Sequence, residues 1–185
     1  MSSALPPTRD TCRYTSCYCE ENIWQLATDA RYQQRESAVV VVTNRSQTVA
    51  LWHQRAAEEL YQPVIWDYHV ILLSRDDTRW LVWDLDSNLD FPVAIDVYLS
   101  TTFPNWEQWE KSLLAKFRVI PANEFCELFA SDRSHMRDGD SWLAMPPEWP
   151  CIGDGRPSNL NRFLELGDDI AGTVMDMQSL AAMYS

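Results

Sequence analysis

The chain has 185 residues, of which 46% are hydrophobic and 23% are charged. This length and composition are typical of one domain with a packed core and exclude wholesale disorder. The net charge of −12, with no basic run, excludes binding to a nucleic-acid phosphate backbone but suits a cationic ligand such as an α-amino group. No apolar stretch approaches membrane-spanning length, so we expect neither nucleic-acid nor membrane partners, and we expect a monomer.

The number of cysteines is odd, and residues 1–20 lack the apolar core of a signal peptide. Residues 1–11 predict a loose N-terminal arm. We therefore expect a protein of the cytosol or the nucleus with reduced thiols, at least one of which is present for its reactivity. The cysteines are Cys12, Cys17, Cys19, Cys126 and Cys151.

The first half of the chain predicts one helix followed by several strands. Ile23, Trp24 and Ala27 recur at helical spacing after the candidate N-cap Ser16, which predicts a helix over residues 17–30. Runs rich in β-branched and aromatic residues, bounded by polar turns, predict strands, and a further stretch has helical character. The predicted strands are 38–43, 48–52 as its hairpin partner, 64–73, 80–85 and 93–99, and the helical stretch is 53–60.

The second half of the chain predicts mainly helices. Residues 137–158 are rich in proline and glycine, which predicts a loop. The order of helix, consecutive strands and helices favours a single α+β domain over residues 1–185, with a central, mainly antiparallel sheet flanked by helices. The predicted helices are 105–116, 123–129, 159–166 and 177–183, and a strand is predicted over 117–120.

A histidine and an aspartate are predicted to meet across the hairpin formed by the strands 64–73 and 80–85. If residues 74–79 form a symmetric turn, His69 and Asp84 lie directly opposite each other on one face. An acid beside a histidine fixes its tautomer and stabilises the imidazolium that forms during proton transfer. This pairing depends on the register, because a bulge or a one-residue slip would break it.

Two cysteines are candidates for a nucleophile that this pair could activate. Cys17 and Cys19 lie near the start of the predicted helix, where the helix dipole lowers the pKa of a thiol. The acids Glu20 and Glu21 oppose that effect, so an imidazole partner is needed. Among the three histidines only His69 has an acid predicted beside it. A thiol on a helix, with histidine and aspartate on neighbouring strands, is similar to the papain and transglutaminase-like architecture.

Structural explanations of the same residues remain open at this point. A cysteine is often a small buried hydrophobe, His69 would suit a core histidine, and Asp84 would suit the start of a turn. A zinc site from Cys17, Cys19 and a histidine matches structural zinc spacing poorly, so we expect no metal and no cofactor. The alternatives for function are a cysteine peptidase or acyltransferase, and a non-catalytic adaptor that uses its tryptophans and the proline-rich loop.

Several segments resemble one family in the same order along the chain. Residues 16–24 (SCYCEENIW) resemble the signature of the protein N-terminal glutamine amidohydrolases, and residues 64–70 (VIWDYHV) match the WDYHV motif of that family. The resemblance covers roughly residues 9–166. Its further segments are DLD at 84–86, KFRVI at 116–120, FASDRSHM at 129–136, the proline-rich stretch 146–152 and NLN at 159–161.

The resemblance implies a reaction in which a peptide with N-terminal glutamine and water give the glutamate peptide and ammonia. Peptides and proteins with N-terminal glutamine are then the partners, and the product feeds the arginine branch of the N-degron pathway. The resemblance also implies a catalytic triad of Cys19, His69 and Asp84. It selects Cys19 over Cys17, a choice that the physical reasoning leaves open.

Recognition of the first residue of a peptide requires a group that pairs with its α-ammonium. Glu21, Asp67 and Asp132 are candidates for this role, and Trp66 is a candidate wall of the substrate pocket. Each also has a structural explanation: the glutamate as a first-turn helix acid, the aspartates as turn or capping residues, and the tryptophan as core.

Overall fold

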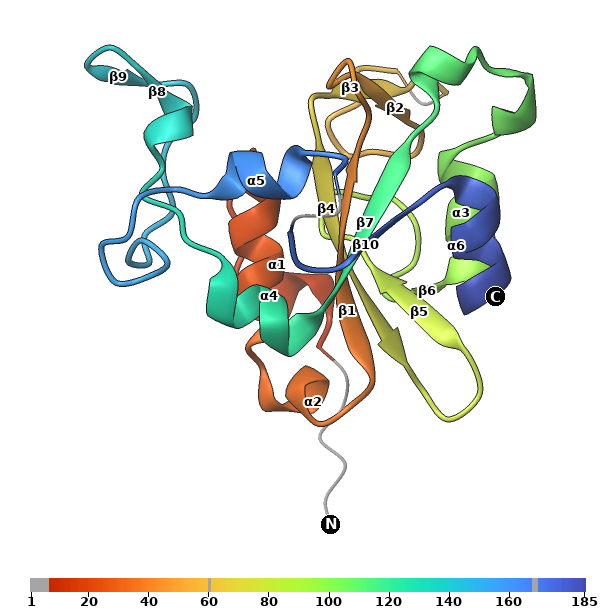
Figure 1. The fold of residues 1–185 in the computed structure, drawn as a ribbon, viewed down its shortest axis with the longest axis horizontal. Coiled ribbons are helices and arrows are strands. Elements are labelled where there is room, and N and C mark those ends of the chain that lie inside the picture. Colours follow the sequence, from red (N-terminus) through yellow and green to blue (C-terminus); the bar gives the residue numbers. More distant parts are fainter. Residues whose placement is uncertain (1–6, 60, 168–169) are drawn as a thin grey trace.

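The centre of the molecule is a six-stranded sheet in which all neighbouring strands are antiparallel. The computed structural model describes residues 7–59, 61–167 and 170–185, and Figure 1 shows the sheet between two groups of helices. The α+β class with a flanked antiparallel sheet is therefore confirmed, whereas the papain-like comparison stays a prediction. In order across the sheet the strands are β10 (Thr173–Met175), β7 (Lys116–Pro121), β1 (Ser37–Thr43), β4 (His69–Arg75), β5 (Trp80–Trp83) and β6 (Val93–Ala94).

The remaining elements are short pairs of strands, helices and single helical turns. Two strand pairs stand apart from the main sheet, β2 (Val49–Leu51) with β3 (Val64–Trp66) and β8 (Arg137–Asp138) with β9 (Ser141–Trp142). The α-helices are α1 (Cys19–Ala27), α2 (Ala30–Gln33), α3 (Ile95–Thr102), α4 (Ala122–Leu128), α5 (Leu160–Leu164) and α6 (Met177–Tyr184). The 3-10 turns are η1 (Arg9–Thr11), η2 (Trp106–Gln108), η3 (Lys111–Leu113) and η4 (Ser134–Met136).

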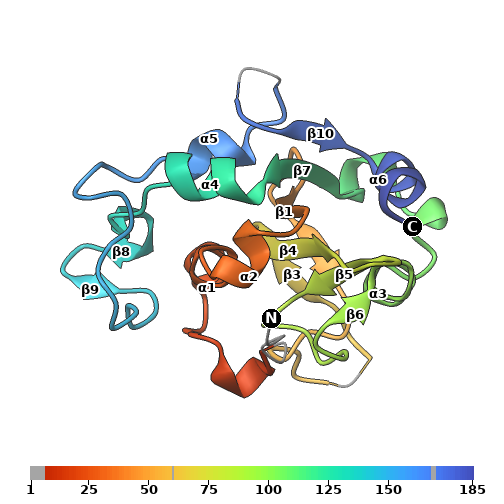
Figure 2. The ribbon, with the colours of Figure 1, turned by 90° about the horizontal axis from the view of Figure 1, so that it is seen from below.

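The two faces of the sheet carry separate hydrophobic cores. Val39 and Val41 of β1 pack in one core with residues of α1, α4 and α5, while Val40 and Val42 pack in the other with residues of α3 and α6. Figure 2, which views the sheet from below, shows helices on both of its sides. Burial on both faces explains why β1 is a continuous run of β-branched residues and does not alternate with polar ones.

The predicted hairpin between 38–43 and 48–52 is wrong. Both edges of β1 are occupied, by β4 on one side and β7 on the other, so β2 pairs with β3 instead. The predicted strand 64–73 is broken at Asp67 and Tyr68. The Oδ1 of Asp67 accepts a hydrogen bond from the backbone N–H of Tyr68, and Thr43 Oγ1 donates to the carbonyl of Asp67 at 3.1 Å. These bonds fix the bend that places His69 at the start of β4.

Three further predictions of secondary structure differ from the structure. Residues 53–59 form bends and turns instead of a helix, with a left-handed φ of 56° at His53, and Leu60 lies outside the described residues. Only the first two residues of the predicted strand 93–99 are extended, and α3 follows. The predicted helix 105–116 is interrupted, because Asn105 has φ 53° and Trp109 is extended, so only η2 and η3 form.

The remaining helices and strand of the second half agree with prediction: β7, α4, α5 and α6 lie where they were expected. The predicted N-terminal arm lies partly outside the described residues, namely 1–6. Residues 9–11 form η1, and the Arg9 guanidinium donates to the carbonyl of Leu89 at 2.9 Å, so this part is attached to the domain. None of the helices in the described part of the chain is long and apolar enough to cross a membrane.

Candidate active site

Helix α1 begins at Cys19, two residues later than predicted. Cys17 has φ 66°, a left-handed conformation that a helix cannot contain, so Ser16 is not the N-cap. Tyr18 occupies the cap position without a capping side-chain hydrogen bond. Cys17 is consequently exposed, whereas Cys19 is the first helical residue and is half-buried. The backbone N–H of a first helical residue has no partner within the helix.

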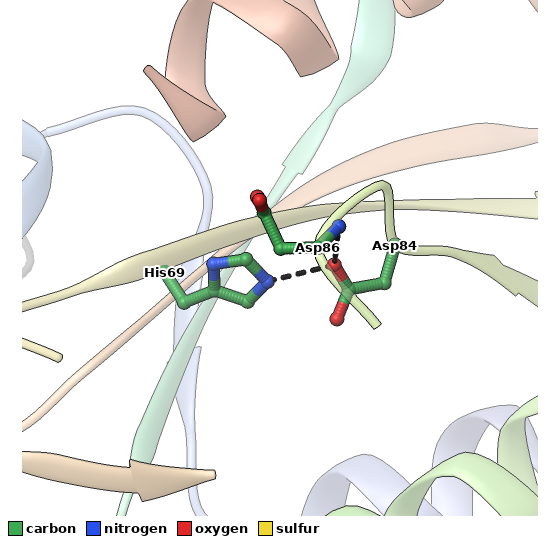
Figure 3. Close-up of side chains that lie close together, drawn as sticks. All are labelled: His69, Asp84 and Asp86. Atoms are coloured by element: carbon green, nitrogen blue, oxygen red, sulfur yellow. Dashed lines mark hydrogen bonds and ion pairs between the residues drawn. The ribbon is translucent and has the colours of Figure 1, made fainter. Parts of the chain in front are cut away.

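His69 and Asp84 are hydrogen-bonded neighbours. The Nε2 of His69 and the Oδ1 of Asp84 are 2.9 Å apart, and both side chains are buried (Figure 3). His69 opens β4, and Asp84 follows the last residue of the neighbouring β5. Because Asp84 occupies Nε2, Nδ1 is the ring nitrogen that remains for a proton from another group.

The register that brings them together is not the predicted one. Leu72 lies opposite Trp83 and Leu73 opposite Val82, so the same ladder, if extended, would place Asp86 opposite His69. A shift by two residues keeps every side chain on its face. Asp84 therefore stays on the His69 face and reaches the ring from a diagonal position.

The shift originates in the turn between the two strands. The Oδ1 of Asp76 accepts hydrogen bonds of 2.8 Å from the backbone N–H groups of Thr78 and Arg79. These bonds define a four-residue turn over 76–79, centred one position later than predicted. Moving the centre of a hairpin by one residue moves each cross-strand partner by two.

Asp84 is held by three donors. In addition to His69, Tyr98 of α3 donates to Oδ2 at 2.8 Å and the backbone N–H of Asp86 donates to Oδ1 at 3.0 Å. Burial alone would raise the pKa of Asp84, but the charge and hydrogen bond of His69 and the other two donors lower it below its usual value. Asp84 is therefore an anion in a dry environment, suited to stabilise an imidazolium.

Acidic side chains and one aromatic ring surround the His69 ring. Burial lowers the pKa of His69, yet the charge and hydrogen bond of Asp84, followed by the charges of Asp86 and Glu20, raise it above its usual value. Trp66 of β3 stacks on the ring, with centroids 5.9 Å apart and planes 18° apart. Trp66, predicted as a wall of the pocket, thus contacts the candidate base, and its buried Nε1–H has no hydrogen-bond partner among the described residues.

Cys19 lies at the start of α1, which packs against β4, and the surroundings of its thiol favour the protonated form. Burial, followed by the charge of Glu20 and that of Asp86, raises the pKa of Cys19 well above its usual value, and the backbone of Val70 acts weakly in the opposite direction. Burial and neighbouring acids therefore favour the protonated thiol in the free enzyme, and Glu20 acts in the direction that was expected of it.

Glu20 is a second buried acid of the site. Its side chain has no exposed surface, its Oε2 accepts from Tyr68 Oη at 2.9 Å, and Cys19 Sγ lies 3.7 Å from the same oxygen. The other oxygen lies 3.4 Å from Nε2 of His135, without the geometry of a hydrogen bond. His135 thus lies against the acid that follows the candidate nucleophile.

Asp86 completes the group of acids around His69. It is 93% buried, and its Oδ1 accepts a 2.6 Å hydrogen bond from Tyr14 Oη. Burial is the main reason that the pKa of Asp86 is raised. Figure 3 shows its side chain on another side of the imidazole than Asp84, which lies at Nε2.

The same three residues also have the composition of a metal site. One ligand atom from each of His69, Asp84 and Asp86 lies within 4.8 Å of the others. However, Nε2 of His69 and Oδ1 of Asp84 bind each other directly, and Tyr98 occupies the second oxygen of Asp84. The hydrogen bonds satisfy this arrangement without an ion, so it suits an oriented base better than a metal centre.

Three acids predicted to read the substrate have other partners. Glu21 is fully buried, and its two oxygens accept hydrogen bonds from Ser131, Trp149 and both Nε and Nη2 of Arg133, at 2.8–3.0 Å. Four donors leave this carboxylate no free site for an ammonium, so its role is structural. Asp67 and Asp132 are exposed, and each accepts a nearby backbone N–H, as turn residues do.

The site also contains residues that the sequence did not predict. Tyr98, Asp86 and Glu20 all contact the predicted histidine, aspartate or cysteine, or lie beside them. Asp86 could have been predicted from the sequence, because residues two positions apart in an extended strand lie on the same face, and Asp86 is two residues after Asp84. Tyr98 could not, since the segment that contains it was predicted to be a strand.

Comparison with known proteins shows the family of this chain. The family described as N-terminal glutamine amidase matches residues 14–184. A protein N-terminal glutamine amidohydrolase of Bos taurus is 38% identical over 97% of this chain and 90% of its own length. Proteins of the same name from Homo sapiens and Caenorhabditis elegans are 40% and 36% identical, over 86% and 93% of this chain and 81% and 95% of theirs. The chain therefore belongs to the N-terminal glutamine amidase family.

Proposed function

We propose that this chain is a cysteine-dependent protein N-terminal glutamine amidohydrolase with Cys19 as nucleophile, His69 as acid and base, and Asp84 as the residue that orients His69. The observation that carries the proposal is the family match over residues 14–184, which includes all three residues. The hydrogen bond between His69 and Asp84, and the position of Cys19 at the start of α1 against β4, support these roles.

The first half of the reaction forms a thioester. Neutral His69 takes the thiol proton at Nδ1 while Sγ of Cys19 attacks the side-chain amide carbon of the substrate glutamine. The tetrahedral intermediate then collapses: the C–N bond breaks, His69 returns the proton to the leaving nitrogen, and ammonia departs. Asp84 stabilises the imidazolium between these steps. The free backbone N–H of Cys19 is the candidate donor to the oxyanion.

The second half returns the enzyme to its starting state. Water attacks the thioester carbon while His69 takes one of its protons. The C–S bond breaks, the proton passes to the sulfur of Cys19, and the product carries a glutamate side chain. One amide and one water are thus converted to one carboxylic acid and one ammonia, which become carboxylate and ammonium at neutral pH.

The proposal also includes the pathway, the cellular compartment and the oligomeric state of the protein. The product, a chain with N-terminal glutamate, would enter the arginine branch of the N-degron pathway, as the family resemblance implies. All five cysteines are free thiols, which supports a reducing compartment such as the cytosol or the nucleus. A monomer is expected, and light scattering coupled to size-exclusion chromatography measures this directly.

Ammonia release tests the activity. Three peptides of matched length would be compared: one that begins with glutamine, one that begins with asparagine, and one in which glutamine is only internal. Release from the first alone, with a mass gain of about one unit in the product, supports the proposal. Cys19→Ala should abolish release, while Cys17→Ala, the matched thiol variant, should retain it. Release from all three peptides would indicate a general amidase, and cleavage of the peptide would indicate a peptidase.

A further inference from the structure

One carboxylate oxygen of Asp86 has no partner among the described residues. Asp86 accepts from Tyr14 through Oδ1, and no hydrogen bond or ion pair to its Oδ2 is present among the described residues. The side chain is 93% buried, but Oδ2 is not among the fully buried atoms that lack a partner, so this oxygen keeps a small exposed surface. A buried anion with an unpaired oxygen is costly unless a cation or a donor completes it.

The position of Asp86 suits a group attached to the substrate glutamine. Four covalent bonds separate the side-chain amide carbon of glutamine from its α-nitrogen, which spans about 5 Å at most. Whatever reads the α-nitrogen must therefore lie next to the reacting atoms. One carboxylate oxygen of Asp86 lies within 4.8 Å of a His69 nitrogen, and its charge acts on Cys19 as well.

The negative charge of the site is also not neutralised by ion pairs with lysine or arginine side chains of the described residues. Glu20, Asp84 and Asp86 surround His69 and Cys19, and none of these acids forms an ion pair with a lysine or arginine in the described part of the chain. Arg55 and Arg9 act on Asp86 through their charges, but neither forms an ion pair with it. The Arg55 guanidinium donates to the carbonyl of Leu85 and lies over the Tyr14 ring. The Arg9 guanidinium donates to the backbone carbonyls of Asp84 and Leu89. A cationic substrate group would offset this excess of negative charge.

We infer that Asp86 binds the α-ammonium of the substrate and that this contact restricts the enzyme to glutamine at the first position. The inference rests on the proposed function and adds the residue that reads the chain terminus. An internal glutamine presents an amide N–H without charge at that position, so it would leave the buried Asp86 anion unpaired. A short ion pair with a desolvated carboxylate is among the stronger polar contacts in proteins.

The other acids of the site fit this role less well. Glu20 is completely buried, so a substrate ammonium cannot reach it. Its Oε2 accepts from Tyr68 and lies near the Cys19 thiol, and its Oε1, which has no hydrogen bond, lies against His135. Asp84 is saturated by its three donors. Among the acids next to the reacting groups, Asp86 alone combines slight exposure with an oxygen that has no partner.

The test compares two substrates that differ only in the α-amino group. One peptide begins with glutamine, and its analogue begins with a 4-carbamoylbutanoyl group, which retains the side-chain amide but lacks the amine. For the wild type we expect kcat/KM to be about 10²-fold higher for the amine substrate. In Asp86→Asn this ratio should fall to within a few-fold of one, mainly through loss of activity on the amine substrate.

Control variants separate this role from general damage. Asp96→Asn removes an equal charge from the exposed first turn of α3 and should leave the ratio unchanged. An unchanged ratio in Asp86→Asn, or an equal loss on both substrates, would overturn the inference, as would collapse of the ratio in Asp67→Asn or Asp132→Asn instead. No ammonia from the amine substrate in the folded wild type would contradict the proposed function itself.

A second measurement does not require a variant of Asp86. In Cys19→Ala protein, which cannot turn over, the carboxyl-carbon resonance of Asp86 should shift when the glutamine peptide is added. The 4-carbamoylbutanoyl peptide should leave it in place at equal occupancy. A shift of equal size with both peptides would contradict an ammonium contact.

Discussion

Tyr98 donates a 2.8 Å hydrogen bond to Oδ2 of Asp84, the oxygen that His69 does not use. This bond connects α3, on one face of the sheet, to the pair at the end of β4 and β5. Tyr98 has no exposed surface, so no water can replace its hydroxyl if it is removed. The orientation of the candidate base thus depends on a helix that carries no part of the triad.

Tyr98→Phe should lower kcat about 10-fold with little change in KM, because a buried oxygen of Asp84 loses its donor. Steady-state kinetics on the glutamine peptide measure the effect. Tyr61→Phe, at a residue that is 80% exposed, provides the matched control and should behave as the wild type. An unchanged kcat in Tyr98→Phe would mean that His69 and the backbone N–H of Asp86 suffice to position Asp84.

Asp84→Asn should leave the fold nearly intact and lower turnover by a factor on the order of 10³. The amide matches the carboxylate in shape, yet it cannot stabilise an imidazolium and can present the wrong group to Nε2 of His69. Circular dichroism would establish folding, and ammonia release would report turnover. Full activity in this variant would show that Asp84 does not have the proposed role.

The pH dependence of kcat/KM follows from the environment of His69. His69 must be neutral to accept the thiol proton, and Asp84, Asp86 and Glu20 all raise its pKa above the usual value of about 6.5. Activity should therefore fall as the pH drops through that raised pKa. In Asp84→Asn the largest of these charges is gone, so the acid limb of the residual activity should move to lower pH. A limb that stays in place would point to a different titrating group.

Alkylation by iodoacetamide should report the charge around Cys19. Near neutral pH the wild-type Cys19 should react more slowly than the exposed Cys17, because burial, Glu20 and Asp86 raise the pKa of its thiol. Asp86→Asn removes one of these charges and should accelerate the alkylation of Cys19 several-fold, while Cys17 serves as the internal reference. Peptide mapping by mass spectrometry follows both sites. An equal rate of Cys19 alkylation in the wild type and in Asp86→Asn would show that the charge of Asp86 does not affect the thiol.

The buried pair of Glu21 and Arg133 should be important for stability. Arg133→Ala leaves the Glu21 carboxylate buried without its bidentate partner, which should cost about 3–5 kcal/mol of unfolding free energy. Denaturant melts would measure the loss. The exposed pair of Arg75 and Glu36 is the matched control, and Arg75→Ala should change stability by no more than about 0.5 kcal/mol.

The sequence was most informative where a local pattern determines the structure. The run of valines in β1 predicted a buried strand, and the residues of β7, α4 and α6 predicted their own elements. The segment of α3 was misread because Ile95, Tyr98 and Leu99 are hydrophobic and adjacent to a true strand. Their spacing is that of a helix, and their burial against the second core follows it.

The pairing of His69 with Asp84 was predicted for a partly wrong reason. A symmetric turn was assumed, whereas the side chain of Asp76 fixes a turn centred one residue later. The two residues are still close together because the register differs from the predicted one by two residues, which leaves each side chain on the same face of the strand. Local turn chemistry thus decides details that hydrophobic alternation leaves open.

Contacts between distant segments could not be predicted in this way. The partners of Glu21, which include Ser131, Arg133 and Trp149, lie more than a hundred residues along the chain. Nothing near Glu21 in sequence distinguishes a carboxylate that binds a guanidinium from one that binds a substrate. Only the packing of α1 against the segment that follows α4 makes that distinction.

The protonated thiol of Cys19 has a consequence for the durability of the enzyme. Peroxide oxidises thiolates much faster than thiols, and the first product, a sulfenic acid, leads to disulfides or to irreversible acids. A nucleophile that keeps its proton while the site is empty is protected from this damage between turnovers. The acids that make the Cys19 thiol less reactive in the free enzyme therefore also protect it from oxidation. The positive charge of the substrate α-ammonium then offsets the negative charge of these acids.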